Sequence, residues 1–310
     1  MSDKTKLKNI SKIDYRFFSD IEFKLIDWLW EGAFAKGKVS IVAGDPGLGK
    51  SQLTLSIAAI VSSGGIWPAS ENSMSKSDVI ILAAEDYPED TIGPRLQAAG
   101  ADLSMCIYID SVIESANSTI RSFNIKKDIH YLAKIIEQLR NHSIAISLVI
   151  IDSITAYLGD NSHDNSEVRR ILSPLSDFAI KFQVAIVCIS HLNKNENSAA
   201  LLRISGSVAF VATARSAFLV LRDNKDKERL SFIPFKNNLA RDQTGFSFKI
   251  EPIQLDGGIH TSRMDWDDET VSKTVSEVRG GNQNMTKKSA ETGAIEYLQD
   301  ILANGGIAGH

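Results

Sequence analysis

The sequence predicts an α/β fold in which a mostly parallel β-sheet is covered by helices and followed by an antiparallel hairpin extension. Short apolar runs rich in Ile, Val and Leu alternate with segments of helical periodicity, which is typical of a parallel sheet buried on both faces. The chain has 310 residues, 43% of them hydrophobic and 23% charged, which suits one large globular domain with short extensions. We expect an N-terminal arm or cap over residues 1–37, the α/β domain over 38–264, and a linker with a short C-terminal helix over 265–310.

The N-terminal part is polar at first and then carries an aromatic cluster formed by Phe23, Trp28, Trp30 and Phe34. This cluster is expected to pack on the core as a cap, and the alternative is an arm that contacts another subunit. Strands are predicted next at 39–43, 78–84, 105–109, 147–151, 184–190 and 216–221. Helices are predicted between them at 51–63, 88–99, 128–141 and 166–182.

The pattern changes to antiparallel near residue 217. Residues 218–222 and 230–235 flank the charged stretch DNKDKE and predict a hairpin, and residues 246–252 predict one more strand. The polar stretch 265–293 contains two adjacent glycines and predicts a flexible linker. Residues 290–302 predict a short amphipathic helix.

The stretch GDPGLGKS follows the first strand, precedes the first helix and fits the pattern of a phosphate-binding loop. Its glycines let successive backbone N–H groups turn toward an anion, and the N-terminus of the helix adds its dipole. Lys50 is expected to reach the β- and γ-phosphates of a nucleotide, and the Ser51 hydroxyl to ligate Mg²⁺. The predicted nucleotide-binding residues are Gly44, Asp45, Pro46, Gly47, Leu48, Gly49, Lys50, Ser51 and Gln52.

Polar groups also follow three other strands, at the sheet edge where open α/β folds bind their ligands. Asp152, at the end of LVIID, is the expected carboxylate for the metal. Glu85 is the candidate general base that orients a water against the γ-phosphate, and Asp86 is expected to cap the helix that starts at Pro88. His191 ends the strand AIVCIS and is the candidate sensor of the γ-phosphate.

These strand ends resemble RecA-type motor ATPases, and within that group the chain is similar to the RepA-type hexameric replicative helicases of plasmids and the related RepA-like ATPases of phages and mobile elements. The resemblance covers roughly residues 21–252 and rests on WLWEGAFAKGKVSIVAGDPGLGKS, ILAAEDYPEDTIGPRLQAAGAD, LVIIDSITAYLGD, AIVCISHLNK and GSVAFVATARSAFLVLRD. It implies a RecA-like P-loop NTPase core that hydrolyses ATP with Mg²⁺. Glu85 would activate water, Asp152 would support the metal, and His191 would report on the γ-phosphate.

The resemblance also implies groups that act on the nucleotide of a neighbouring subunit. Arg215, in VATARSAF, falls where the family places an arginine that stabilises the charge of the transition state across the interface. Lys236, in PFKNN, is the candidate second cation, and Arg241 is a weaker candidate for that role. Asn237 and Asn238 stand where the family usually carries basic residues, so the second cation stays open.

A homo-oligomer in the form of a hexameric ring and a part in DNA replication follow from the same resemblance. In such motors, loops facing the central pore grip single-stranded DNA, and the corresponding stretches here are residues 159–166 and 194–206. The first is acidic, the second carries only Lys194 and Arg203 as cations, and neither offers an aromatic platform for a base. Binding of single-stranded DNA therefore rests on the resemblance rather than on these residues.

Three alternatives stay open: an ATP-switched regulatory or scaffold protein that oligomerises without unwinding DNA, a recombinase-like filament, and a small-molecule kinase, which Glu85 and His191 disfavour. The net charge of −4 excludes a global basic field for nucleic acid. Cys106 and Cys188 lie in apolar stretches, as buried thiols do in a reducing compartment, and form no metal-ligand pair. No signal-peptide pattern and no apolar run near the ~18 residues of a bilayer span are found, so we expect a cytoplasmic location and no membrane partner.

Overall fold

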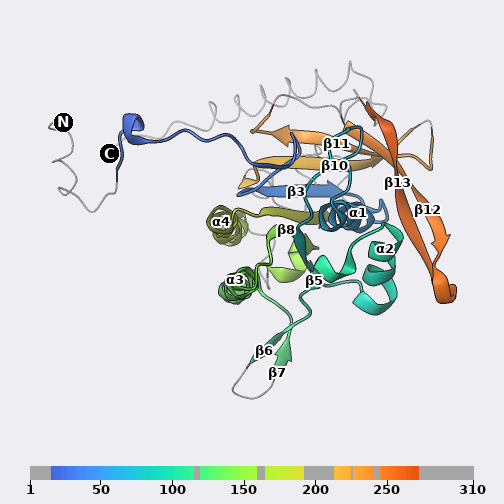
Figure 1. Ribbon diagram of the computed structural model, residues 1–310, viewed down its shortest axis with the longest axis horizontal. Coiled ribbons are helices and arrows are strands. Elements are labelled where there is room, and N and C mark those ends of the chain that lie inside the picture. The colour runs from blue at the N-terminus through green and yellow to red at the C-terminus, as the bar shows by residue number, and fades with distance from the viewer. Residues whose placement is uncertain are drawn as a thin grey trace, which may run out of the picture.

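A computed structural model describes residues 15–114, 119–158, 165–191, 213–224, 226–240 and 245–271. A nine-stranded sheet runs through this part of the chain in the order β13-β12-β11-β10-β3-β9-β8-β4-β5 (Figure 1). Neighbouring strands from β10 to β5 are parallel, and these strands are β3 (Val39–Gly44), β4 (Asp78–Ala83), β5 (Cys106–Tyr108), β8 (Ile146–Asp152), β9 (Ala185–His191) and β10 (Ser216–Arg222). The predicted α/β fold with a mostly parallel sheet is confirmed.

The sheet continues beyond β10 with the antiparallel strands β11 (Leu230–Asn237), β12 (Gly245–Gln254) and β13 (His260–Val271). The predicted hairpin is therefore confirmed as β10–β11. The predicted start of the linker at Asp265 is wrong, because residues 265–271 form the second half of β13 and pair with β12. In this strand Met264 is buried and Trp266 is half-buried, so buried and exposed side chains alternate. The neighbouring charged residues make this alternation difficult to recognise in the sequence.

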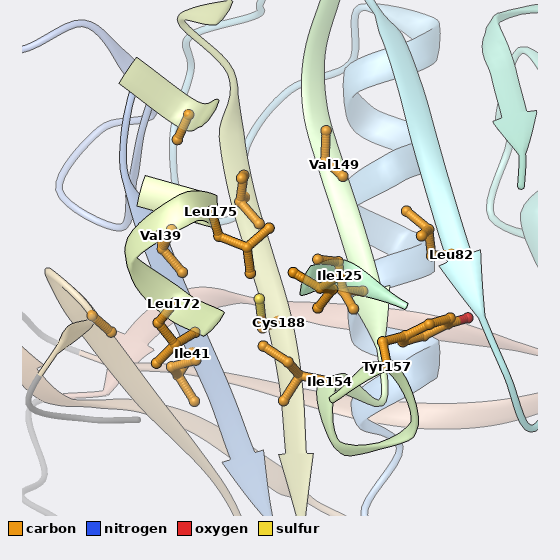
Figure 2. Packing of buried hydrophobic residues seen from close by; sticks show 14 of the residues in the cluster. Val39, Ile41, Leu82, Ile125, Val149, Ile154, Tyr157, Leu172, Leu175 and Cys188 are labelled. Carbon is orange, nitrogen blue, oxygen red and sulfur yellow. The ribbon is translucent and has the colours of Figure 1, made fainter. Parts of the chain in front are cut away.

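Helices cover both faces of the sheet, with α1 (Lys50–Ser63) and α2 (Gly93–Ala98) on one side and α3 (Ile125–Asn141) and α4 (Asn165–Phe182) on the other (Figure 1). Leu172 and Leu175 of α4 pack over Ile41 and Cys188 of the sheet, as Figure 2 shows. On the other face, α1 is buried around nearly its whole circumference, because the sheet lies on one side and β13 on the other. The helix that follows the phosphate loop is therefore held from two directions.

The predicted helix over residues 88–99 is interrupted. Residues Pro88–Ile92 form a π-helical turn, and the α-helix begins only at Gly93. A Cβ on Gly93 would lie 2.7 Å from the Pro88 carbonyl oxygen, so the glycine permits the close approach of that turn. The hairpin β6 (Val112–Glu114) and β7 (Thr119–Arg121) and the short turns η4 (Leu103–Met105), η5 (Ile154–Tyr157) and η7 (Asp256–Gly258) complete the connections.

The N-terminal part divides into a cap and an extended segment. The hairpin β1 (Trp28–Trp30) and β2 (Phe34–Ala35) buries Trp30 and Phe34 against Trp67 and Phe232, so the predicted cap is confirmed for these residues. Residues 15–27, which include the turn η2 (Phe18–Asp20), extend away from the body of the molecule (Figure 1). We call residues 15–27 the arm.

Several predictions fall on residues outside the described ranges: the helix at 290–302, the linker beyond residue 271, the loop at 194–206, most of the loop at 159–166, and Arg241. Cys188 is fully buried as predicted, whereas Cys106 is only half-buried, at the edge of the sheet. Within the described ranges, no helix combines the length and apolar character that crossing a membrane requires.

Candidate functional site

The phosphate loop connects the end of β3 to the start of α1. Gly47 and Gly49 have φ angles of 75° and 70°, a left-handed conformation that other residues rarely adopt. Lys50 is 4% exposed, and its Nζ donates a hydrogen bond of 2.9 Å to the backbone oxygen of Asp45. Burial lowers the pKa of Lys50, and the nearby carboxylates of Asp152, Asp45 and Glu85 oppose that shift. The ammonium group thus lies inside the curl of the loop, where a phosphate oxygen is expected to replace the carbonyl oxygen.

The strand order brings the other candidate residues to the same edge of the sheet. Strand β9 pairs with β3 so that His191 lies opposite Gly44. Strand β8 is next, and β4 pairs with it so that Ala83 lies opposite Asp152. The four predicted strand ends therefore follow one another along the carboxyl edge, with β9 between the strand of the phosphate loop and the strand of Asp152.

Asp152 lies near the first turn of α1, close enough for the Ser51 hydroxyl to influence the pKa of its carboxyl group. Burial raises its pKa to about 6, and Glu85 and Asp86 add to that rise, whereas the Ser51 hydroxyl and Lys50 oppose it. A hydroxyl and a carboxylate near one another offer the oxygen ligands that Mg²⁺ prefers. Across the described residues, no group of three or more His, Cys, Asp or Glu is able to hold a metal ion. The pair therefore fits an ion that takes its remaining ligands from phosphate and water.

Glu85 is held by residues from two other strand ends. Ser153 is 1% exposed, and its hydroxyl donates a hydrogen bond of 3.1 Å to Glu85 Oε1. His191 Nε2 lies 3.7 Å from the same oxygen. Burial and the positive charge of Lys50 lower the pKa of His191, with Glu85 opposing, so the neutral imidazole is favoured. The sequence pattern identified Glu85 and His191 but missed Ser153, although it directly follows Asp152.

Asp86 has a different role from the one that the sequence predicts. The residue before the helical turn is Tyr87, and no side chain caps that turn. Asp86 Oδ2 instead accepts a hydrogen bond of 2.9 Å from Nη1 of Arg95 in α2. The capping prediction is therefore wrong, because an ion pair one helical segment further along takes the carboxylate.

The first turns of α1 are fastened to β13. Gln52 Nε2 donates a hydrogen bond of 2.8 Å to the Ser262 carbonyl oxygen, and the Ser262 hydroxyl donates one of 3.2 Å to Gln52 Oε1. One turn later, Trp266 Nε1 donates to the Ser56 hydroxyl at 3.0 Å. The side chain of Gln52, predicted to contact the nucleotide, is thus engaged with β13 and 3% exposed. These pairs lie 210 positions apart in the chain, so no local pattern announces them.

Arg215 and Lys236 lie on the opposite edge of the sheet from the phosphate loop. Ser216 pairs with Ser40 at the beginning of β3, whereas the loop follows the end of that strand. Five residues of β3 separate its beginning from its end, a distance of roughly 17 Å along the strand. Lys236 Nζ donates a hydrogen bond of 2.8 Å to the Ala214 carbonyl oxygen. Burial together with the charge of Arg215 lowers the pKa of Lys236. The two cations are therefore neighbours, at a distance from the phosphate loop that no side chain spans.

A family model described as AAA domain matches residues 6–197, which is more than half of the chain. The chain belongs to the AAA domain family. Domains of this family are P-loop ATPases that typically bind a nucleotide and Mg²⁺, in agreement with the loop and with the Ser51–Asp152 pair. The matched residues include Lys50, Glu85, Asp152 and His191. The match ends before Arg215 and Lys236. No curated protein matches the chain.

Proposed function

We propose that this AAA domain hydrolyses ATP as one subunit of a homo-oligomeric RecA-type motor, in a hexameric ring, of the kind that the replicative helicases of plasmids and phages form. The observation that carries the proposal is the carboxylate of Glu85, which Ser153 orients on the same sheet edge as Lys50, Asp152 and His191. A carboxylate at this position is suited to orienting a water against the γ-phosphate.

In the proposed reaction, a water oxygen attacks the γ-phosphorus, the bond to the β–γ bridging oxygen breaks, and the water proton passes to Glu85. Ser153 and His191 both lie against Oε1 of Glu85, so we assign the proton from the water to Oε2 of Glu85. Lys50 exchanges the Asp45 carbonyl oxygen for a phosphate oxygen, and Ser51 and Asp152 would hold Mg²⁺. When bound, the ion supplies charge that offsets the phosphate oxygens.

The second part of the proposal is that hydrolysis takes place between subunits. Arg215 is exposed and too far from the phosphate loop of its own chain to act there. A neighbouring subunit that presents this edge would bring Arg215, with Lys236 beside it, to the γ-phosphate. An arginine supplied in this way raises hydrolysis by about 10³–10⁵ in other nucleotide hydrolases.

The arm supports assembly. It carries Phe18, Phe23 and Leu25, whose exposed fractions are 79%, 82% and 98%, on a segment that leaves the body of the molecule (Figure 1). Large apolar side chains gathered on an extended segment are typical of a surface that another chain covers. We assign the arm to contact with the next subunit.

A second candidate function is an ATP-switched scaffold that oligomerises without unwinding DNA, and the sparse cations of residues 194–206 favour it. The test combines mass measurement with and without ATP, hydrolysis with and without single-stranded DNA, and strand displacement on forked DNA. The motor predicts a ring, stimulation by DNA and displaced strands. A ring that hydrolyses ATP but displaces no strand supports the scaffold, and a monomer under all conditions contradicts both.

A further inference from the structure

A cavity of about 170 Å³ lies at the carboxyl edge of β4, to the side of the nucleotide site. It is enclosed by the ends of β4 and β5, by η5 and by the residues that lead into α3. Lys50 and Asp152 do not line it. Its lining includes Glu85, Asp86, Tyr108, Asp110, Phe123 and Tyr157. The cavity thus combines carboxylates with aromatic rings.

The negative charge around the cavity exceeds the positive charge. Of the three carboxylates, Asp86 is paired with Arg95. Arg121 precedes a lining residue, but Asp128 binds its guanidinium at 2.6 and 2.8 Å, and Glu114 binds it at 2.6 Å. None of the described residues that line the cavity is a lysine or an arginine. Glu85 and Asp110 therefore line the cavity without a lysine or arginine among the lining residues.

Tyr157 supplies a second and independent observation. Its side chain is 4% exposed, and its hydroxyl makes no hydrogen bond to any other residue in the described part of the chain. Figure 2 shows this hydroxyl beside the end of β4. The hydroxyl of Tyr108, by contrast, donates a hydrogen bond of 3.1 Å to the Ala83 carbonyl oxygen. The Tyr157 hydroxyl is the polar end of a mostly buried side chain that lines the cavity, so it is available to hydrogen-bond a ligand there.

We propose that this cavity binds an organic cation, a guanidinium or primary ammonium group carried on a short apolar chain. The rings of Tyr108, Phe123 and Tyr157 offer faces and edges to the cation and its chain, with Phe123 and Tyr157 at 6.2 Å and nearly perpendicular. Asp110 and Glu85 supply the charge, and the Tyr157 hydroxyl accepts an N–H.

The cation has two possible sources, a basic side chain of a protein or a free small amine. Calorimetric titrations of the full chain without nucleotide distinguish them, with agmatine as the free cation and the blocked peptide acetyl-Gly-Arg-Gly-amide as the side chain. The same peptide with citrulline is the neutral isostere. We expect at least one cation to bind and the citrulline peptide not to. Absence of heat with both cations, or equal binding of the citrulline peptide, overturns the proposal.

Two substitutions locate the bound cation. Asp110→Asn removes one charge and is expected to weaken binding about tenfold or more, and Tyr157→Phe, which removes a single oxygen, several-fold. Asp256→Asn removes another exposed carboxylate, from η7 between β12 and β13, and is expected to leave cation binding unchanged. Melting curves verify that the variants fold. Wild-type affinity in both Asp110→Asn and Tyr157→Phe contradicts the assignment.

The cavity does not depend on the proposed hydrolysis, because binding is measured without ATP. Asp110→Asn is expected to hydrolyse ATP as the wild type does. If the wild type does not hydrolyse ATP, the proposed function is refuted and the cation site is not affected. If the wild type binds no cation, the cation site is refuted and the proposed function is not affected.

Discussion

The Ser153 hydroxyl donates a hydrogen bond of 3.1 Å to Glu85 Oε1, linking the segments that follow β8 and β4. The Glu85 side chain is 63% exposed, so little else restrains it. Ser153 itself is buried, and its oxygen lies 3.0 Å from Thr155 Oγ1, which keeps the hydroxyl in place. The proposed base is thus oriented by a residue that need not touch the nucleotide.

Ser153→Ala is expected to lower kcat for ATP hydrolysis about tenfold and to leave KM nearly unchanged, because one hydrogen bond to a charged group is lost. Steady-state phosphate release at several ATP concentrations measures both constants. Ser70→Ala, the same change on an exposed loop, is the control. A wild-type kcat in Ser153→Ala, or an effect confined to KM, would contradict the positioning role.

Asp152→Asn is expected to stabilise the nucleotide-free protein at pH 7.5. The folded pKa of about 6 lies above the ordinary aspartate value of 3.8, so the stability that this group contributes is complete below pH 3.8 and is lost as the pH rises through 6. The shift corresponds to at most about 3 kcal/mol at neutral pH, which the neutral amide avoids.

Urea unfolding of Asp152→Asn and wild type at pH 7.5 and pH 4.5 measures this difference. The gain in the free energy of unfolding should shrink at the lower pH, and Asp256→Asn should show no gain at either. An equal gain at both pH values would mean that titration of Asp152 is not its cause.

Gln52→Ala is expected to lower the free energy of unfolding by about 1–3 kcal/mol, because it removes both hydrogen bonds to Ser262 in a buried contact. Urea unfolding measures the loss, with Gln97→Ala on the exposed side of α2 as the control. If the two variants are equally stable, β13 does not fasten α1 in solution.

Arg215→Ala is expected to lose hydrolysis, by about 10³-fold or more, while it still binds ATP. Mixing it with Lys50→Ala subunits should restore part of the activity, because an intact loop in one subunit then meets an intact arginine from the next. Arg222→Ala, an exposed arginine at the other end of β10, is the control. Two inactive variants that stay inactive when mixed would refute a shared site.

The sequence allowed the parallel sheet and the residues at its carboxyl edge to be predicted, because each apolar strand is followed directly by its polar group, as in Ile151–Asp152 and Ser190–His191. Contacts between distant segments escaped prediction, as the Gln52–Ser262 pair shows. The second half of β13 was hidden by its charges, and Asp86 was assigned to the nearest helix start because its partner Arg95 lies in a later segment. The end of the sheet at which Arg215 lies depends on the register between β10 and β3, and no sequence motif gives that register.

The proposed hydrolysis depends on the Glu85 carboxylate, which activates the water that attacks ATP. Phosphate release by wild type, Glu85→Gln and the exposed control Glu89→Gln, with Mg²⁺ and alongside a measurement of ATP binding, tests it most directly. We expect all three proteins to bind ATP with similar affinity and only Glu85→Gln to lose turnover, by about 10²–10⁴-fold. Normal phosphate release by Glu85→Gln would show that Glu85 is not the general base.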